Sequence, residues 1–386
     1  MKKSILFTIL LLLLTGNSVY GQEGEIMQDK KETVLSKVID IVKQEQKQIP
    51  GTDIQGIHQS IQIEILEGSA KGRIVVVNDD FLELKKGQKF YLLHTVRWEG
   101  GADLYSVQEP YRLPKVFIFV GIFLLSVFVF GGIQGIRGLV SLVGSFILIL
   151  YVLLPGILQG YSPILITISV SSLIIILGSY VTHGFNKTTS SAVVGMIATV
   201  IFTGILGYVA VISTGLSGYG SEEIVYLNLN ARGSIDVVGL LFGGIMIGLL
   251  GVLYDVAIGQ AITVEELLRI APHVPRKTIY QRAIRIGREH IGALVNTLAI
   301  AYVGAALPML LLVLQASTDS IWVVLNRESF STEIIRTTIG SLGLILAVPI
   351  TTIITMWMLN RGKKVIVDKK LIEKEEHALE HVGHKH

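Results

Sequence analysis

Long apolar blocks alternate with short polar connections over residues 115–359 and dominate the pattern of the chain. A helix needs about 20 consecutive apolar residues to cross the hydrocarbon core of a bilayer. The fold class expected from this pattern is an α-helical polytopic membrane protein. It would have about seven transmembrane helices, at roughly 115–136, 138–158, 162–183, 190–213, 235–257, 291–314 and 335–359.

Residues 22–114 have the polar and apolar alternation of a small domain outside the membrane. A helix is predicted over 31–47 from the helical spacing of Val34, Val38, Ile41 and Val42. Turn residues then separate four alternating or β-branched segments, which predict strands over 60–66, 72–78, 88–94 and 103–107. Short strands of this kind are typical of SH3- or OB-like barrels, so we expect a small N-terminal β-barrel-like domain.

The first 21 residues have the features of a secretory signal peptide. Lys2 and Lys3 precede a short apolar run, and small residues allow cleavage after Gly21. An uncleaved anchor is the alternative, and both interpretations place the next segment outside the cytoplasm. The expected parts are a signal peptide, an extracytoplasmic helix plus β-domain, a membrane domain and a basic, His-rich cytoplasmic tail, over 1–21, 22–114, 115–359 and 360–386.

Lysine and arginine residues gather on alternate connections between the apolar blocks. If residues 22–114 lie outside, the inner connections hold most of these residues, whereas the outer connections hold only Arg232 and Arg327. Cytoplasmic loops of membrane proteins carry such an excess of positive charge. The pattern predicts a multi-pass protein of a bacterial cell membrane, with its N-terminal domain outside and its C-terminus in the cytoplasm.

The composition agrees with a membrane protein and argues against other classes. Charged residues make up 16% of the 386 residues, against about 25% in soluble domains. A soluble enzyme, a disordered chain and a nucleic-acid-binding protein are therefore excluded as first interpretations. The absence of cysteine excludes disulfides and thiolate catalysis. The expected partners are the lipid bilayer and either a second copy of the chain or another membrane protein, with no nucleic acid.

Asp255 is the sharpest candidate for chemistry, because an acidic residue inside a span is costly. It lies near the inner end of the fifth block and fits a proton or cation site. The alternative is an interfacial acid that bonds to a neighbouring helix or pairs with a loop arginine. Asn296 and Thr297 lie about one turn into the sixth block, at a similar depth. His290 precedes them, and histidine titrates near neutral pH, so these four residues are the candidates for ion or proton coupling.

The fifth block is also rich in glycine. Small residues at intervals of four let helices approach closely in membranes. We therefore favour helix packing over a substrate path for Gly239, Gly243, Gly244, Gly248 and Gly251.

The connection between the fifth and sixth blocks carries an amphipathic stretch. Residues 278–290 combine apolar positions at helical spacing with a basic face. This pattern predicts an interfacial helix attracted to anionic lipid, with a coupling helix as the alternative.

Enzymatic and metal chemistry find little support in the sequence. His377 and His381 lie four residues apart, as in helical metal sites, but no acidic or cysteine residues complete the ligand set. We favour a solvated tail and expect no cofactor and no metal. No nucleotide-binding, hydrolase or metalloprotease motif occurs, so the sequence does not indicate an enzyme.

A specific pattern of residues runs through the fifth and sixth blocks, at 236–241, 248–257, 288–298, 301–304 and 307–308. This pattern resembles the signature of the YibE/F-like family of multi-pass bacterial membrane proteins. The resemblance extends over about 115–360 and implies an integral membrane protein of uncharacterised function, with no catalytic residues to transfer. Residues 258–263 depart from the small residues that usually follow in the family.

A weaker likeness is to the RND transporter superfamily, including its SecD/SecF branch. There an acid late in one span precedes an inner helix and a polar next span. Asp255, the acidic pair at 265–266 and Asn296-Thr297 follow the same order. The analogy favours a transporter or export accessory coupled to an ion or proton through Asp255. The alternative is a non-catalytic scaffold or sensor whose exported β-domain binds a partner.

Overall fold

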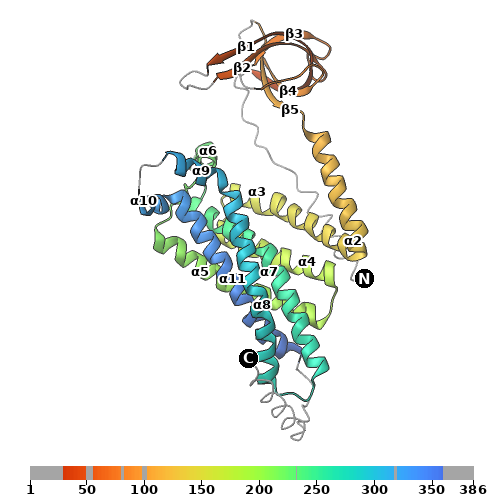
Figure 1. Ribbon diagram of the computed structural model, residues 1–386, viewed down its shortest axis with the longest axis vertical. Helices are drawn as coiled ribbons and strands as arrows, with labels where there is room; N and C mark the ends of the chain where they lie inside the picture. The colour runs from red at the N-terminus through yellow and green to blue at the C-terminus, as the bar shows by residue number, and fades with distance from the viewer. Residues whose placement is uncertain are drawn as a thin grey trace. The chain divides into compact units, whose positions relative to one another are not determined.

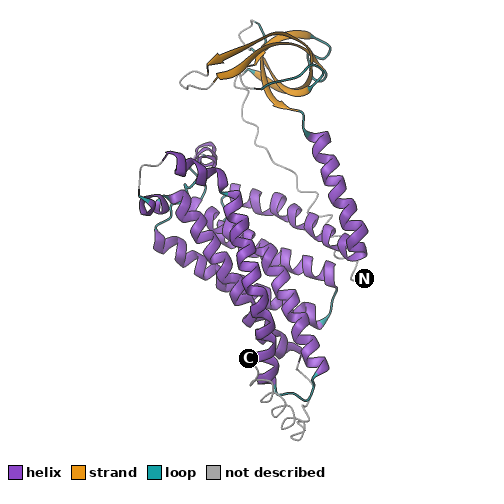
Figure 2. Ribbon diagram, viewed as in Figure 1, coloured by secondary structure: helices purple, strands orange, loops and turns teal. Residues whose placement is uncertain are grey.

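The structure is a computed structural model that describes residues 29–48, 55–79, 82–97, 102–231, 233–316 and 320–359 (Figure 1). The chain divides into two compact units, with the boundary between Phe130 and Gly131. Strands form the body of the first unit and helices form the second, as Figure 2 shows. The expected signal peptide and the His-rich tail, including His377 and His381, lie outside the described residues.

The first unit contains one antiparallel sheet with the strand order β3-β2-β1-β4-β5. The four strands predicted from alternation are confirmed as β2, β3, β4 and β5. The bounds of the five strands are β1 Lys30–Gln48, β2 Gln55–Ile65, β3 Ile74–Asp79, β4 Lys89–Val96 and β5 Leu104–Pro110.

The helix predicted over 31–47 is wrong, because this segment is the central strand β1. Val34 and Val38 point into the core with strand spacing, and β1 pairs with both β2 and β4. A bulge after Val38 adds one residue to β1, so that Ile41 returns to the inner face. Because of this extra residue, the inward-facing positions Val34, Val38 and Ile41 are separated by four and then three residues. These intervals are the same as those along one face of a helix.

The sheet curls around its own core but stays open in its hydrogen bonding, so the expected barrel is not confirmed (Figure 1). Strands β3 and β5 are its two edges. Side chains link the segments just before these edges, because Arg73 forms an ion pair with Asp103 at 3.4 Å. The core is made of buried apolar side chains, including Val38, Ile61, Ile63, Ile65, Phe90 and Leu92.

The described part of the second unit is helical, and the boundary between the two units falls within helix α2. A π-helical turn, η1 (Ile149–Leu153), joins α2 to α3. The helices are α2 Leu113–Leu148, α3 Leu154–Leu158, α4 Pro163–His183, α5 Lys187–Thr214, α6 Glu222–Asn230, α7 Val237–Ile270, α8 Arg276–Ala305, α9 Leu307–Ala316, α10 Ile321–Asn326 and α11 Glu328–Leu359.

Five of the described helical segments are long and apolar enough to cross a membrane, or six if α8 and α9 form one span bent by 60°. The expected seven spans are therefore not confirmed. The two spans expected first are counted as one segment of 46 residues, Leu113–Leu158. The backbone of this segment leaves the helical conformation at Gly132, where φ is 53° and ψ is −143°. Glycine tolerates such a positive φ, and the break lies shortly before residue 137, which separates the first two expected spans.

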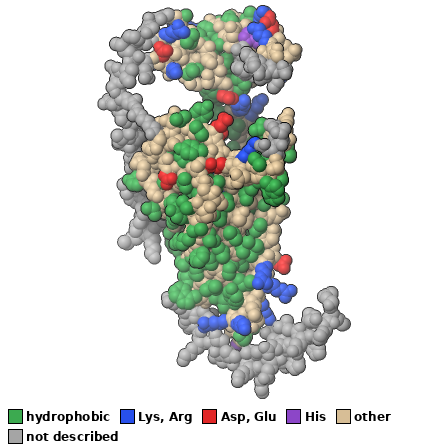
Figure 3. Space-filling model, turned by 90° about the vertical axis from the view of Figure 1, so that its left-hand side faces the viewer, with side chains coloured by type: hydrophobic (Ala, Val, Ile, Leu, Met, Phe, Trp, Pro, Cys, Tyr) green, Lys and Arg blue, Asp and Glu red, His purple; other side chains and the backbone are tan. Residues whose placement is uncertain are grey.

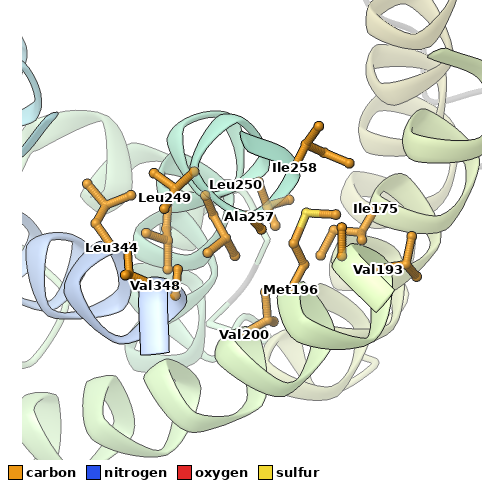
Figure 4. Close-up of a cluster of buried hydrophobic side chains, with 14 of the residues drawn as sticks. Ile175, Val193, Met196, Val200, Leu249, Leu250, Ala257, Ile258, Leu344 and Val348 are labelled. Carbon is orange, nitrogen blue, oxygen red and sulfur yellow. The ribbon is translucent and has the colours of Figure 1, made fainter. Parts of the chain in front are cut away.

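Helix α7 is the most buried of the candidate spans. It packs against α4, α5, α8 and α11. Figure 4 shows the resulting core, where Met196 and Val200 of α5 face Leu249 and Ala257 of α7. Figure 3 shows hydrophobic side chains spread over the surface of the helices, with Lys and Arg side chains gathered at one end. The surface pattern is that of a membrane protein.

The amphipathic stretch at 278–290 is not a separate interfacial helix, because it is the first half of α8. Its apolar positions Ile279 and Ala283 are buried in the helical unit. Gly287 lies against the side chains of Val348 and Gln260, so this stripe packs on α11 and α7. Protein, rather than lipid, covers the apolar face.

Candidate functional site

Asp255 lies on α7 next to the end of α4. Its neighbour Tyr254 places its ring 6.0 Å from the His183 ring and donates a hydrogen bond from its hydroxyl to the Gly178 carbonyl at 3.2 Å. Asp255 itself is exposed in the structure and lies within electrostatic range of His183. The carboxylate of α7 and the imidazole of α4 therefore influence each other electrostatically, without a hydrogen bond or ion pair between them among the described side chains.

The structure does not join Asp255 to the polar residues of α8. Asn296 and Thr297 are exposed, and the Thr297 hydroxyl donates to the Ala293 carbonyl of its own helix at 2.9 Å. His290 is also exposed. Among the described side chains, no hydrogen bond connects Asp255 with any of these three.

The five glycines singled out from the sequence lie on α7 and meet different surroundings. A Cβ atom on Gly243 would lie 2.8 Å from the Thr167 hydroxyl of α4, and one on Gly248 would lie 2.6 Å from the Tyr302 hydroxyl of α8. Gly239 faces the capping Asp236 and, at 3.1 Å, Pro163 of α4. Gly244 and Gly251 have open space around this position. The helix thus has close contacts at three glycines and free surface at two.

A pocket in the helical unit, here named the Arg336 pocket, has a volume of about 600 Å³. Helices α6, α7, α8, α9 and α11 and the loop before α6 contribute its walls. Leu240, Leu241 and Met309 are among its apolar lining residues. Its polar lining residues are Ser221, Glu223, Tyr302, Ser329, Thr332, Glu333 and Arg336.

The loop wall of this pocket is held against the start of α11. The Ser217 hydroxyl contacts both carboxylate oxygens of Glu328, at 2.8 and 2.7 Å. Gly218 has a φ of +85° and lies so close to the Val237 backbone that a Cβ would be 2.6 Å from its carbonyl oxygen. Only glycine combines this conformation with this approach. Gly220 then lies beside Thr332, which completes the wall.

An ion pair lies in this pocket near the start of the long apolar helix α11. Nη1 of Arg336 is 3.0 Å from Oε1 of Glu333, and both side chains are less than one-third exposed. Nε of Arg336 and the hydroxyl of Thr332 are buried and have no hydrogen-bond partner in the described part of the chain. Buried polar atoms are normally bonded, so the two free groups indicate that water or a ligand completes them.

A second pocket, the His183 pocket, has a volume of about 240 Å³. It is formed by the end of α4, the start of α5 and the C-terminal part of α7. Asn186 caps α5 by accepting a hydrogen bond from the Thr189 backbone N–H at 2.7 Å. Glu265 lines the opposite wall. The pocket therefore combines a helix N-terminus, a histidine and a carboxylate.

A buried amide between the helices was missed by the sequence reasoning. Nε2 of Gln260 on α7 donates to the Thr352 hydroxyl of α11 at 2.7 Å and to the Ala283 carbonyl of α8 at 3.0 Å. Sequence reasoning also missed Glu333 and Arg336. Their signal was available, because they are charged residues at the edge of an apolar block, the same rule that selected Asp255.

Metal ligands do not gather in the described part of the chain, where no three His, Cys, Asp or Glu side chains are grouped for an ion. His183 and Asp255 form only a pair.

Comparison with known proteins identifies one family. The model of the YibE/F-like protein family matches residues 119–361, which is more than half of the chain. No curated protein and no solved structure matches, so no relative supports the weaker likeness to the RND superfamily. The matched region contains Asp255 and both pockets. The chain therefore belongs to the YibE/F-like family.

Proposed function

We propose that the protein is a transporter or export accessory of a bacterial cell membrane, coupled to an ion or proton through Asp255. The observation that carries this proposal is that one central helix lines both pockets. Leu240, Leu241 and Gly244 of α7 line the Arg336 pocket, and Ile258, Ala261, Ile262 and Glu265 line the His183 pocket.

The two pockets are separated by packed protein. Leu249 and Leu253 lie between the two sets of lining residues along α7 and are fully buried in the central core, where Figure 4 labels Leu249. A solute that passed from one pocket to the other would require α7 to move against its neighbours. Asp255 lies on this helix just before the His183 pocket, where a change in its charge would act on both α7 and His183. This position suits an ion-linked switch.

The proposed topology has seven spans. Breaking the first segment at Gly132 gives two spans, and joining α8 with α9 gives one. Together with α4, α5, α7 and α11 this makes seven, with the N-terminal domain outside and the basic end of α8 in the cytoplasm. The positive charge of 276–288 supports this orientation.

Proteoliposomes that contain the full chain and an internal pH-sensitive dye test the coupling. A solute gradient, screened with an extract of small metabolites, is expected to move protons with the wild-type protein. The Asp255→Asn variant should lose this flux while it still inserts and purifies normally. Glu266→Gln is the matched control, because Glu266 is an acid on the same helix that lines neither pocket. Wild-type flux in Asp255→Asn would remove Asp255 from the mechanism.

A second candidate function is a membrane scaffold or sensor that binds a partner through the β-domain. Edge strand β3 supports it, because Ile74 and Val76 are more than half exposed there. An unpaired apolar edge is a surface on which another strand can add. Deleting 22–112 separates the two functions: a scaffold would lose partner capture, whereas a transporter would keep its flux.

A further inference from the structure

The Arg336 pocket presents two free hydrogen-bonding groups in a largely apolar wall. The hydroxyl of Thr332 is buried, with the residue only 6% exposed, and finds no partner among the described residues. Nε of Arg336 is also buried and has no hydrogen-bond partner among the described residues. Both residues line the pocket from successive turns of α11. A ligand that enters here can supply the partners that the protein lacks.

The guanidinium of Arg336 determines the kind of group that fits. Its Nη1 already contacts Glu333, so the guanidinium neutralises the Glu333 carboxylate. The edge of the guanidinium that carries Nε is left without a partner among the described residues. The edges of a guanidinium match the paired oxygens of a carboxylate or a phosphate. The Thr332 hydroxyl, one turn away, can donate to the same oxygens. This part of the pocket is therefore suited to an anionic group.

The wall from α6 carries the opposite charge. Glu223 lines the pocket, and hydrogen bonds from the Ser221 hydroxyl and from its own backbone N–H hold its pKa below the usual value. Its carboxylate is therefore ionised at neutral pH. Since Glu333 is already paired with Arg336, Glu223 is the acidic lining residue that is left to receive a positive group.

The remaining lining is apolar and roomy. Leu240, Leu241, Ile224, Pro308 and Met309 surround the polar groups. The volume of about 600 Å³ lies within the range of about 300–1,000 Å³ that is usual for small-molecule sites. The ligand should therefore have an apolar body between or beside its charges.

We propose that the Arg336 pocket binds an amphipathic zwitterion, with its anionic group on Arg336 and Thr332 and its ammonium group on Glu223. Two sources share this chemistry, a short peptide and an aminophospholipid headgroup. That this ligand is the cargo rests on the proposed function, whereas its binding can be measured without any transport.

Calorimetric titration of the purified full chain in detergent tests the ligand class. Leucyl-leucine is the soluble probe, and short-chain phosphatidylethanolamine is the lipid probe. Binding of either one is expected and identifies the source. Acetylation of the ammonium group or methyl esterification of the carboxylate of the peptide should weaken its binding by at least about tenfold, because each removes a charge-assisted hydrogen bond. For the lipid, phosphatidylglycerol lacks the ammonium group and should bind correspondingly worse.

Variants of the lining residues locate the site. Thr332→Val keeps the shape of the side chain and should weaken the binding of whichever probe binds the wild type. Glu223→Gln should weaken the binding of the probe that carries an ammonium group. It should leave the affinity for the acetylated peptide or for phosphatidylglycerol unchanged. The double variant Glu333→Gln/Arg336→Gln removes the anion site without leaving a lone carboxylate. Arg327→Gln is the control, because Arg327 lies just before α11 but does not line the pocket.

Three results would overturn the proposal: no binding of either zwitterion, equal binding of the charge-blocked forms, or unchanged binding in the double variant. The outcome is independent of the coupling test. If the wild type binds the zwitterion but shows no flux, only the proposed transport function is contradicted. If it shows flux but binds no zwitterion, only the proposed ligand class is contradicted. Asp255→Asn should bind the zwitterion like the wild type, since Asp255 does not line this pocket.

Discussion

Replacing Gly195 by alanine would place a methyl group against the backbone of α11. The new Cβ would lie 3.1 Å from Cα and 2.7 Å from the hydroxyl oxygen of Thr351, which is fully buried. Backbone atoms cannot rotate away as a side-chain tip can, so α5 and α11 must separate. Overpacking of this kind costs about 1–3 kcal/mol. The better helix propensity of alanine returns up to about 1 kcal/mol.

Subtracting the full propensity gain from this cost leaves a loss of up to about 2 kcal/mol in the free energy of unfolding. For a unit of this size, that loss lowers Tm by up to about 8 °C. Gly251→Ala is the matched control, because nothing lies within 4 Å of its Cβ position on α7. With only the propensity gain, it should raise Tm by about 2 °C.

Thermal unfolding of the purified full chain in detergent, followed by intrinsic tryptophan fluorescence, measures both variants. Gly195→Ala should melt below the wild type and Gly251→Ala at or above it. Equal melting of the two variants would refute the close approach of α5 and α11. A larger residue sharpens the contrast, since Gly195→Val adds further volume at the same contact.

Other variants test the core and the β-domain. Leu249→Ala should destabilise the protein by about 2–5 kcal/mol in the same assay, because it opens a cavity in the central core. Gln260→Leu should cost about 1 kcal/mol through its two hydrogen bonds, whereas Gln281→Leu on the exposed face of α8 should be neutral. In the β-domain, the His94 side chain, whose Nε2 lies 3.0 Å from Oδ2 of Asp103, holds the pKa of Asp103 below its usual value, with further help from Arg73. The ionised carboxylate therefore stabilises the fold at neutral pH, and this contribution is lost as the pH falls below about 4 and through the lowered pKa. Hydrogen exchange of β4 and β5, relative to the intrinsic exchange rate at each pH, should accelerate over that window, and Asp103→Asn should remove this dependence.

Local patterns in the sequence predicted most of the elements, because their signals are local. Length and apolarity alone identify a span, and alternation alone identified strands β2 to β5. Strand β1 failed because its period is broken by a bulge whose position depends on the pairing with β2. The expected spans also stop short of the C-terminal end of α7 and of the N-terminal end of α8. Both helices continue through polar residues until the segment bounded by Pro272 and Pro275, where prolines interrupt the helical pattern.

The candidate site was less predictable, since a pocket is a property of several helices together. The glycines of α7 look equivalent in the sequence, yet their roles depend on the facing residue: Gly248 meets Tyr302, whereas Gly244 lines open space in the Arg336 pocket. No local pattern encodes that difference.

Charge is the exception among the properties of the site, because it can be read one residue at a time. A charge on an apolar helix that crosses a membrane must be compensated, and the compensating group can come from the protein or from a ligand. Asp255 and Arg336 both follow this rule, but only their surroundings distinguish them. Arg336 has Glu333 on its own helix and an unused Nε beside a large pocket, whereas Asp255 has His183 as its charged neighbour among the described residues. The first arrangement fits the binding of a charged solute and the second fits the exchange of a small ion, so we propose different tasks for the two sites within the proposed transport function.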